Sequence, residues 1–184
     1  MTFASAKIHN IWRRAILAKN EPLQEVACAL YFLVAMAAFS GHSLAGEASG
    51  FASGVSDGDT FYMVIDGKST RLRLAEVDAP EKKQPFGRRA EQSLRALLGE
   101  RPITVTWDKI DRYGRPIVQV YAEGVNVNAE QVGRGFAWVY RQYARTSRLY
   151  VLENEARLER RGLWADPSPI EPWVWRKAGR KKEG

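Results

Sequence analysis

Histidine and cysteine are almost absent from this 184-residue sequence. The single cysteine is Cys28 and the two histidines are His9 and His42, so all of them lie ahead of residue 45. We expect that region to be a targeting segment. Once it is removed, the remaining domain can form no disulfide bond, zinc–thiolate site or cysteine nucleophile. Histidine acid–base catalysis and histidine metal ligation are excluded there as well, which directs attention to carboxylates.

The N-terminal region consists of a basic stretch followed by an apolar run. The run covers Val26–Phe39, and its 14 residues are fewer than the roughly 20 that a membrane-spanning helix needs. Ser43-Leu44-Ala45 resembles a signal-peptidase site. We therefore expect residues 1–45 to be a signal peptide and the protein to be exported, that is secreted, periplasmic or held at the envelope. Because the stretch ahead of the apolar run is unusually long, an uncleaved signal-anchor is the alternative.

Positive charge is in excess, with 28 Lys and Arg against 21 Asp and Glu and a net charge of +7. Residues 46–184 keep 24 basic residues against 19 acidic ones, so the excess belongs to the domain rather than to the leader. A basic domain favours polyanionic partners, with nucleic acid first and anionic membrane or cell-wall polymer second.

Hydropathy patterns after the leader predict one mixed α+β domain. Residues 46–50 are small and polar and read as a linker, which would leave the domain over residues 51–167 and a Trp- and Pro-containing extension with a basic tail over 168–184. Alternation and β-branched residues predict strands over residues 60–65, 70–77, 103–107, 116–122 and 136–140. Helical spacing predicts three helices, over residues 87–100, 128–133 and 147–161. Five short strands with inserted helices suggest a Greek-key β-barrel of the OB type.

Two finer expectations concern helix ends and tryptophans. Asn128, with Gln131 three residues later, matches a capping box and predicts that a helix starts there. Trp164, Trp173 and Trp175 are expected to hold the C-terminal segment against the core rather than to bind bases.

Acidic and arginine residues gather where predicted strands end or turn. Asp57-Gly58-Asp59-Thr60 precedes the first strand, Asp78-Ala79-Pro80-Glu81 follows the second, and Asp111–Arg115 joins two later strands. Each motif alone is more often a structural turn than a catalytic site. Their spacing does not match an EF-hand loop. Together they supply carboxylates for a hard cation such as Ca²⁺ or Mg²⁺, a candidate base, and arginines that can bind phosphate.

The order of these motifs resembles the staphylococcal nuclease (thermonuclease) family. The matching segments are VSDGDTF, TRLRLAEVDAPE, QPFGRRAEQSLRALL, DRYGRPIVQVYAEGVNVNAEQVGRGFAWVY and RRGLWADP, and the likeness spans about residues 51–167. The resemblance implies a five-stranded OB-type barrel with three helices. It also implies a calcium-dependent endonuclease that cuts DNA and RNA and leaves a 3′-phosphate.

The resemblance assigns roles to residues that hold the family type in this sequence. Asp59 and Asp78 match calcium ligands, and Ala79 stands where the family often has threonine, whose backbone carbonyl is the ligand. Glu81 matches the general base. Arg73 and Arg115 match the arginines that bind the phosphate and stabilise the transition state.

Substrate contacts follow less directly from the same resemblance. Arg112 and Tyr113 would contact the phosphate end of a nucleotide, and Tyr140 and Tyr143 resemble the nucleotide-contacting tyrosines, although their spacing departs from the family pattern. Packing at the mouth of the barrel is the alternative for the tyrosines. A monomer with DNA or RNA as its partner and no obligate protein partner is expected. The competing hypothesis is a non-catalytic OB-type module that binds nucleic acid or protein.

Overall fold

The computed structural model describes residues 45–180. The predicted leader therefore lies outside the described residues, except for Ala45. Between residues 45 and 180, no helix has the length and hydropathy required to cross a bilayer.

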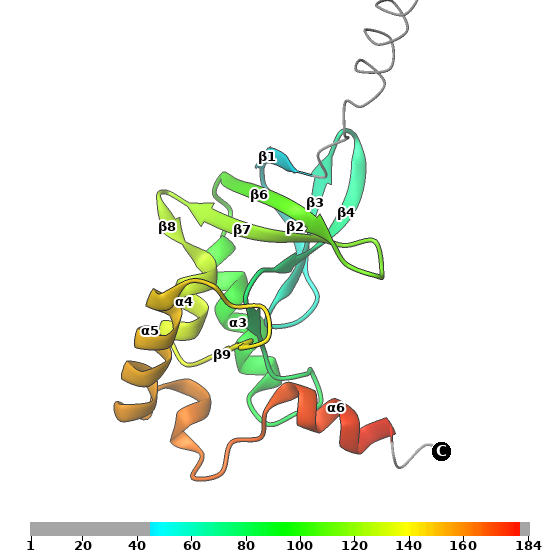
Figure 1. Ribbon diagram of the computed structural model, residues 1–184. Helices are drawn as coiled ribbons and strands as arrows, with labels where there is room; N and C mark the ends of the chain where they lie inside the picture. Colours follow the sequence, from blue (N-terminus) through cyan, green and yellow to red (C-terminus); the bar gives the residue numbers. More distant parts are fainter. Residues whose placement is uncertain (1–44, 181–184) are drawn as a thin grey trace, which may run out of the picture. The chain divides into compact units, whose positions relative to one another are not determined.

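Strands and helices follow one another with short connections (Figure 1). The nine strands of the described chain are β1 (Gly46–Gly50), β2 (Ala52–Val55), β3 (Thr60–Ile65), β4 (Lys68–Leu74), β5 (Val77–Asp78), β6 (Ile103–Ile110), β7 (Pro116–Ala122), β8 (Val125–Asn126) and β9 (Trp138–Val139). Its helices are α3 (Gly87–Leu98), α4 (Val127–Gly133), α5 (Ser147–Leu158), the 3₁₀ turn η1 (Gly162–Ala165) and α6 (Pro172–Arg180). The class is mixed α+β, as predicted.

Seven strands form one sheet, in the order β1-β6-β7-β4-β3-β2, with β8 added alongside β7. Every neighbouring pair is antiparallel except β4 and β7. The two ends of this order, β1 and β2, are consecutive in the chain and only Phe51 separates them. No described ladder joins β1 to β2, so hydrogen bonding leaves the sheet open rather than closing it into the expected barrel.

Alternation along β3 and β4 builds the core. Phe61 and Met63 of β3 and Leu72 and Leu74 of β4 are at most 1% exposed, while the residues between them reach the other face. This is the period of two that the sequence predicts. The polar side chains of the same strands, Arg73 among them, are thereby directed to the opposite face of the sheet.

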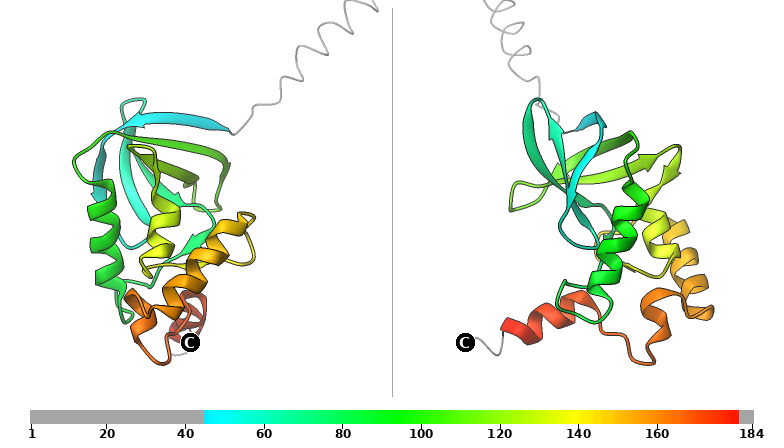
Figure 2. Two further views of the ribbon diagram at one scale, coloured as in Figure 1. Left: turned by 90° about the vertical axis from the view of Figure 1, so that its left-hand side faces the viewer. Right: turned by 180° about the vertical axis from the view of Figure 1, so that it is seen from behind.

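Helices α3, α4 and α5 pack side by side and cover one end of the sheet (Figures 1 and 2). Two buried side-chain amides of α4 connect this helix to neighbouring segments. Asn128 accepts a hydrogen bond from the backbone of Val120, and Gln131 donates to the carbonyls of Gly58 and Ala90. The predicted capping box is therefore wrong: the N-cap of α4 is Asn126, whose side chain accepts from Ala129 N. Asn128 and Gln131 satisfy buried backbone groups instead.

The structure differs from the prediction at both ends of the domain. Residues 46–50, expected as a linker, form β1 and pair with β6 from Trp107 to Ile103. Residues 172–180 form α6, so the described chain has four α-helices where three were expected. Gly, Ala and Ser have weak strand propensity, and pairing with β6 outweighs that local preference.

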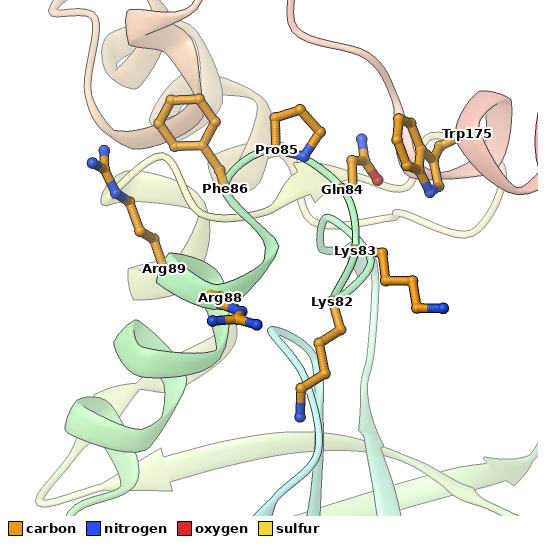
Figure 3. Close-up of a pocket in the computed structure, with 8 residues that line it drawn as sticks. All are labelled: Lys82, Lys83, Gln84, Pro85, Phe86, Arg88, Arg89 and Trp175. Carbon is orange, nitrogen blue, oxygen red and sulfur yellow. The ribbon is translucent and has the colours of Figure 1, made fainter.

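A second core cluster lies beside α5, at the start of the segment that leads to α6. Trp138 and Trp164 are buried, and their ring centroids are 4.3 Å apart. Trp173 packs against Trp138, with 6.0 Å between ring centroids. Trp164 and Trp173 thus hold the C-terminal segment against the core, as expected. Trp175 lies instead beside the loop that precedes α3 (Figure 3).

Candidate active site

Nine of the ten predicted site residues line one pocket of about 650 Å³. They come from the strand end at Asp59, from β4, from the β5–α3 loop, from the β6–β7 turn and from the segment after β9. The nine are Asp59, Arg73, Ala79, Glu81, Arg112, Tyr113, Arg115, Tyr140 and Tyr143. The tenth, Asp78, is fully buried directly behind Arg73. Residues separated by up to 84 positions along the chain are therefore brought together.

Arg73 bridges the two aspartates. Thr60 is the register partner of Arg73 across the β3–β4 pair, which sets the guanidinium next to Asp59. One terminal nitrogen of Arg73 lies 2.8 Å from Asp59 Oδ1, and the other lies 2.9 Å from Asp78 Oδ1. The second oxygen of Asp59 accepts a hydrogen bond from Ala79 N at 2.9 Å. Asp59, Asp78 and Ala79 are thus fixed around one arginine.

Negative charge is concentrated here, and the pKa values reflect it. Burial and the charge of Asp59 raise the pKa of Asp57 to about 6. Burial also raises the pKa of Asp78, helped by Asp59, against the lowering effect of its arginine partners. Burial works against ionisation of Asp59 too, but Arg73 and the Ala79 N–H outweigh it and lower the pKa of Asp59. A further cation would relieve this repulsion.

The donor set fits a hard divalent cation. Asp59 and Asp78 offer carboxylate oxygens, and Ala79, between Asp78 and Pro80, offers a backbone carbonyl. Among residues 45–180 no group of three or more His, Cys, Asp or Glu side chains is placed to hold a metal. The protein would therefore supply only part of the coordination shell, and water or phosphate oxygens would complete it, as Ca²⁺ and Mg²⁺ accept.

Glu81 lies on a loop whose shape is fixed from both sides. Its backbone N–H donates to Gln84 Oε1 at 3.1 Å, and the amide of the buried Gln84 donates to the carbonyl of Ile170 at 2.6 Å. On the other side, a Cβ added to Gly87 would lie 1.9 Å from the Glu81 carbonyl oxygen. Only glycine permits this approach, so the start of α3 positions Glu81.

The β6–β7 turn presents Arg115. Asp111 accepts hydrogen bonds from the backbones of Tyr113 and Arg115, and its other oxygen lies 2.7 Å from the Arg115 guanidinium. Although burial acts in the opposite direction, these bonds lower the pKa of Asp111. Arg112 and Arg115 both lie over the exposed Tyr113 ring, 5.0 and 5.5 Å from its centroid. The turn therefore arranges two cations and one aromatic ring at the pocket.

Tyr140 and Tyr143, which follow β9, form another wall of the pocket, and their ring centroids are 4.9 Å apart. Glu76 fixes this wall: its carbonyl accepts from Tyr140 N, and its carboxylate accepts from the backbones of Arg145 and Thr146. Tyr143 is 58% exposed. The Tyr140 ring is stacked on Trp173 of α6 at 5.6 Å with 10° between the planes, so one face of Tyr140 is already covered.

One residue that lines the pocket, Arg176, was not predicted as a site residue. This α6 residue pairs with Asp78 Oδ2 at 2.7 Å and with Glu81 Oε1 at 2.7 Å. Arg176 is one of five basic residues near the C-terminus, which the sequence pattern presents as a basic tail. Only the tertiary placement of α6 distinguishes Arg176 from its neighbours.

Carboxylates and arginines gathered at one pocket are groups suited to binding and hydrolysing phosphate esters. The family described as "Staphylococcal nuclease homologue" matches residues 71–166. An "Uncharacterized endonuclease" of Escherichia coli O157:H7 is 44% identical over 79% of this chain and 96% of its own length. A "Micrococcal nuclease" of Shigella flexneri is 38% identical over 86% of this chain and 94% of its own length.

A plant protein, "Staphylococcal-like nuclease CAN1" of Arabidopsis thaliana, is 39% identical over 60% of this chain and 34% of its own length. The chain belongs to the staphylococcal nuclease family and is a nuclease that hydrolyses phosphodiester bonds. Membership of this family fits the OB-type fold predicted from the sequence.

Proposed function

We propose that the protein is an exported, calcium-dependent endonuclease that cuts DNA and RNA. The observation that carries this proposal is the convergence of Asp59, Asp78, Arg73, Glu81 and Arg115 at one pocket. These residues combine a cation site, a base and two phosphate-binding arginines.

Asp59, Asp78 and the carbonyl of Ala79 would hold Ca²⁺. Their oxygens are of the type that this ion prefers. Burial, helped by Asp59, raises the pKa of Asp78 in spite of Arg73 and Arg176, and a bound cation would favour its ionised form. When bound, Ca²⁺ supplies positive charge to a phosphate oxygen.

The side chains of this chain carry the other steps. Glu81 accepts a proton from water, whose oxygen forms a bond to phosphorus as the bond to the 5′-oxygen breaks. The departing 5′-oxygen takes up a proton from solvent water, and the 3′-phosphate remains. Arg73 and Arg115 donate hydrogen bonds to the phosphoryl oxygens, where charge accumulates in the transition state.

The contacts proposed for the nucleotide bases predict that the enzyme accepts substrates of many sequences. Arg112 and Tyr113 of the β6–β7 turn line the pocket, and so do Tyr140 and Tyr143, which follow β9. Aromatic stacking tolerates any base. The exposed ring of Tyr143 is more available to a base than Tyr140, which Trp173 covers.

The test is cleavage of plasmid DNA and of an RNA transcript by the full chain with Ca²⁺, with Mg²⁺ and with a chelator. We expect cleavage with Ca²⁺, none with the chelator, and strongly reduced cleavage by Arg115→Ala. Cleavage that persists after chelation would show that the reaction does not depend on a metal ion. Tight binding without cleavage under every condition would favour the non-catalytic module.

Export rests on the sequence of residues 1–45. Expression of the full chain followed by cell fractionation and N-terminal sequencing tests it. We expect a product outside the cytoplasm that starts close to Gly46; an intact N-terminus in the membrane fraction would indicate the signal-anchor instead.

A further inference from the structure

A second pocket, of about 1000 Å³, is lined by the residues that follow Glu81 in its loop. Figure 3 shows its walls: the loop from Lys82 to Phe86, the first turn of α3, and Trp175 of α6. Its lining residues are Lys82, Lys83, Gln84, Pro85, Phe86, Arg88, Arg89 and Trp175. Four of these eight carry positive charge and none carries negative charge.

The cations of this pocket are mostly uncompensated. Lys82 pairs with Glu91 at 3.5 Å, but its side chain is 63% exposed, so this pair is weak. Lys83, Arg88 and Arg89 form no ion pair with any residue between 45 and 180. Like charges gathered in this way repel one another, and an anion among them would relieve the repulsion.

The N-terminus of α3 adds to the positive potential. Its first turn contains Arg88 and Arg89 and no acidic residue, and within the described chain no side chain caps it. Helix N-termini favour negative charge because their first backbone N–H groups point outward without acceptors. Arg88 and Arg89 therefore add their charges to a helix end that already favours an anion.

Flat apolar surfaces accompany the charges. Phe86 and Trp175 lie on two sides of the loop, and the Arg89 guanidinium lies 5.4 Å from the centre of the Phe86 ring (Figure 3). Cations that follow a backbone, together with rings on which bases stack, are the usual features of single-strand binding. An anion without a ring would make no use of Trp175.

The two pockets meet at two points of the chain. Glu81 and Arg176 line the candidate active site, whereas their immediate neighbours Lys82 and Trp175 line the basic pocket. Consecutive Cα atoms are about 3.8 Å apart, and the Arg176–Glu81 ion pair joins the two chain segments. The basic pocket therefore adjoins the candidate active site at Glu81 and Arg176.

We propose that this basic pocket is a second subsite that binds the single-stranded continuation of the polynucleotide beyond the scissile phosphate. Lys83 and Arg88 bind backbone phosphates, and Trp175 stacks on a base. The inference rests on the proposed nuclease function, because it takes the strand to be held at the active site.

The test measures binding separately from cleavage. Full-length protein in chelator is titrated with a fluorescent dinucleotide and with a fluorescent 12-nucleotide single strand at several salt concentrations. The test variant is Lys83→Glu with Arg88→Glu. The matched control is Lys68→Glu with Arg148→Glu, which makes the same charge change at exposed positions that line neither pocket. The milder double variant Lys83→Gln with Arg88→Gln removes the two charges without reversing them, and it shows whether the loss of binding persists when the disturbance to the fold is smaller.

Relative to the control, we expect the test variant to weaken binding of the 12-mer about tenfold. Its plot of log affinity against log salt should become shallower by about 1.4, the value for two lost phosphate contacts on a single strand. The ratio of 12-mer to dinucleotide affinity should fall about tenfold. Trp175→Ala should weaken 12-mer binding about fivefold without changing the salt slope, and Trp175→Phe should restore part of it.

Test and control variants with equal 12-mer affinities and equal salt slopes would overturn the subsite. So would a test variant that loses binding to vesicles containing phosphatidylglycerol but keeps binding to the 12-mer, because the pocket would then be a lipid site. Failure of the nuclease function has a different signature: wild-type protein in Ca²⁺ cleaves neither oligonucleotide, while the pocket variants still reduce 12-mer binding.

Discussion

At the scale of single residues, Arg73 allows two buried aspartates to lie side by side. Asp59 and Asp78 are 4% and 0% exposed, and the same guanidinium pairs with both. Buried carboxylates left without a partner are strongly destabilising, because removing one member of a buried ion pair leaves an uncompensated charge. Arg73 therefore supports the fold as well as the chemistry that we propose for it.

Arg73→Lys should lower the free energy of unfolding by about 3 kcal/mol in chelator, because one ammonium cannot reach both aspartates as the guanidinium does. Saturating Ca²⁺ should recover part of this loss, since the ion compensates the same carboxylates. Urea unfolding with and without Ca²⁺ measures both effects. Arg71→Lys, on the same strand but 45% exposed, is the control and should change stability little. An equal loss with and without Ca²⁺ would contradict the shared site.

Gly87 matters because the loop that carries Glu81 passes directly over it. A Cβ at this position would lie 1.9 Å from the carbonyl oxygen of Glu81, so Gly87→Ala must displace the loop or the start of α3. We expect cleavage to fall at least tenfold and the free energy of unfolding to fall by about 2 kcal/mol. Gly179→Ala, where a Cβ would meet no atom within 4 Å, is the matched control. Full activity of Gly87→Ala would show that the position of Glu81 is not critical.

At the scale of secondary-structure elements, α6 reaches the candidate active site from outside the residues that match the family model. It sends Arg176 to Asp78 and Glu81 and lays Trp173 on Tyr140. The family match ends at residue 166, before α6 starts at Pro172. The helix thus acts on the same carboxylates as the proposed calcium ion, although it lies outside the matched residues, as Asp59 does at the other end.

Arg176→Ala should tighten calcium binding about fivefold, because the guanidinium occupies both oxygens of Asp78 and repels a second cation. Isothermal titration calorimetry of the full chain measures this without depending on turnover. Lys177→Ala, an exposed neighbour on α6, removes the same charge away from the carboxylates and should leave the affinity nearly unchanged. Weaker calcium binding in Arg176→Ala would mean that Arg176 organises the site rather than competing for it.

The β6–β7 turn is a second element whose stability can be tested, through pH. The lowered pKa of Asp111 means that its ionised form is favoured in the folded state. Its contribution to stability is then fully present above the unfolded value of about 3.9 and is lost as the pH falls through the folded value. Asp111→Asn should cost about 1 kcal/mol at pH 7, and the difference from wild type should vanish in strong acid.

Urea denaturation of both proteins at pH 7, 4 and 2.5 follows this difference. A difference that stays constant over the whole range would show that the charge of Asp111 does not stabilise the turn. A parallel decrease in phosphate binding by the Asn variant at pH 7 would link the turn to the position of Arg115.

At the scale of the whole molecule, the sequence predicted the parts of the site that depend on local motifs. Strands over residues 60–65 and 116–122 and a helix from residue 87 follow from periodicity, and they are present. The predicted hairpin explains why Asp59 and Arg73 lie close together, because Thr60, next to Asp59, is the register partner of Arg73. The resemblance in order and residue type then brought the distant Glu81 and Arg115 into the same site.

What the sequence could not predict depends on contacts between distant segments. Residues 46–50 look like a linker because their strand pairing is made with β6, more than 50 positions away. Asn128 resembles a helix cap, yet its side-chain amide accepts a hydrogen bond from the backbone of Val120 and donates one to the carbonyl of Ala75. In the sequence, Arg176 is one arginine of a basic segment; only the position of α6 shows that it forms an ion pair with Asp78. No local pattern contains that information.

The most direct test of the whole account is the single-turnover cleavage rate of Glu81→Gln on a single-stranded oligonucleotide at saturating Ca²⁺. If Glu81 is the base that activates water, the rate should fall by about 10²- to 10⁴-fold, with oligonucleotide affinity within about threefold of wild type. A cleavage rate within tenfold of wild type would contradict the account, because the pocket would then hydrolyse phosphodiesters without the carboxylate on which the proposed mechanism depends.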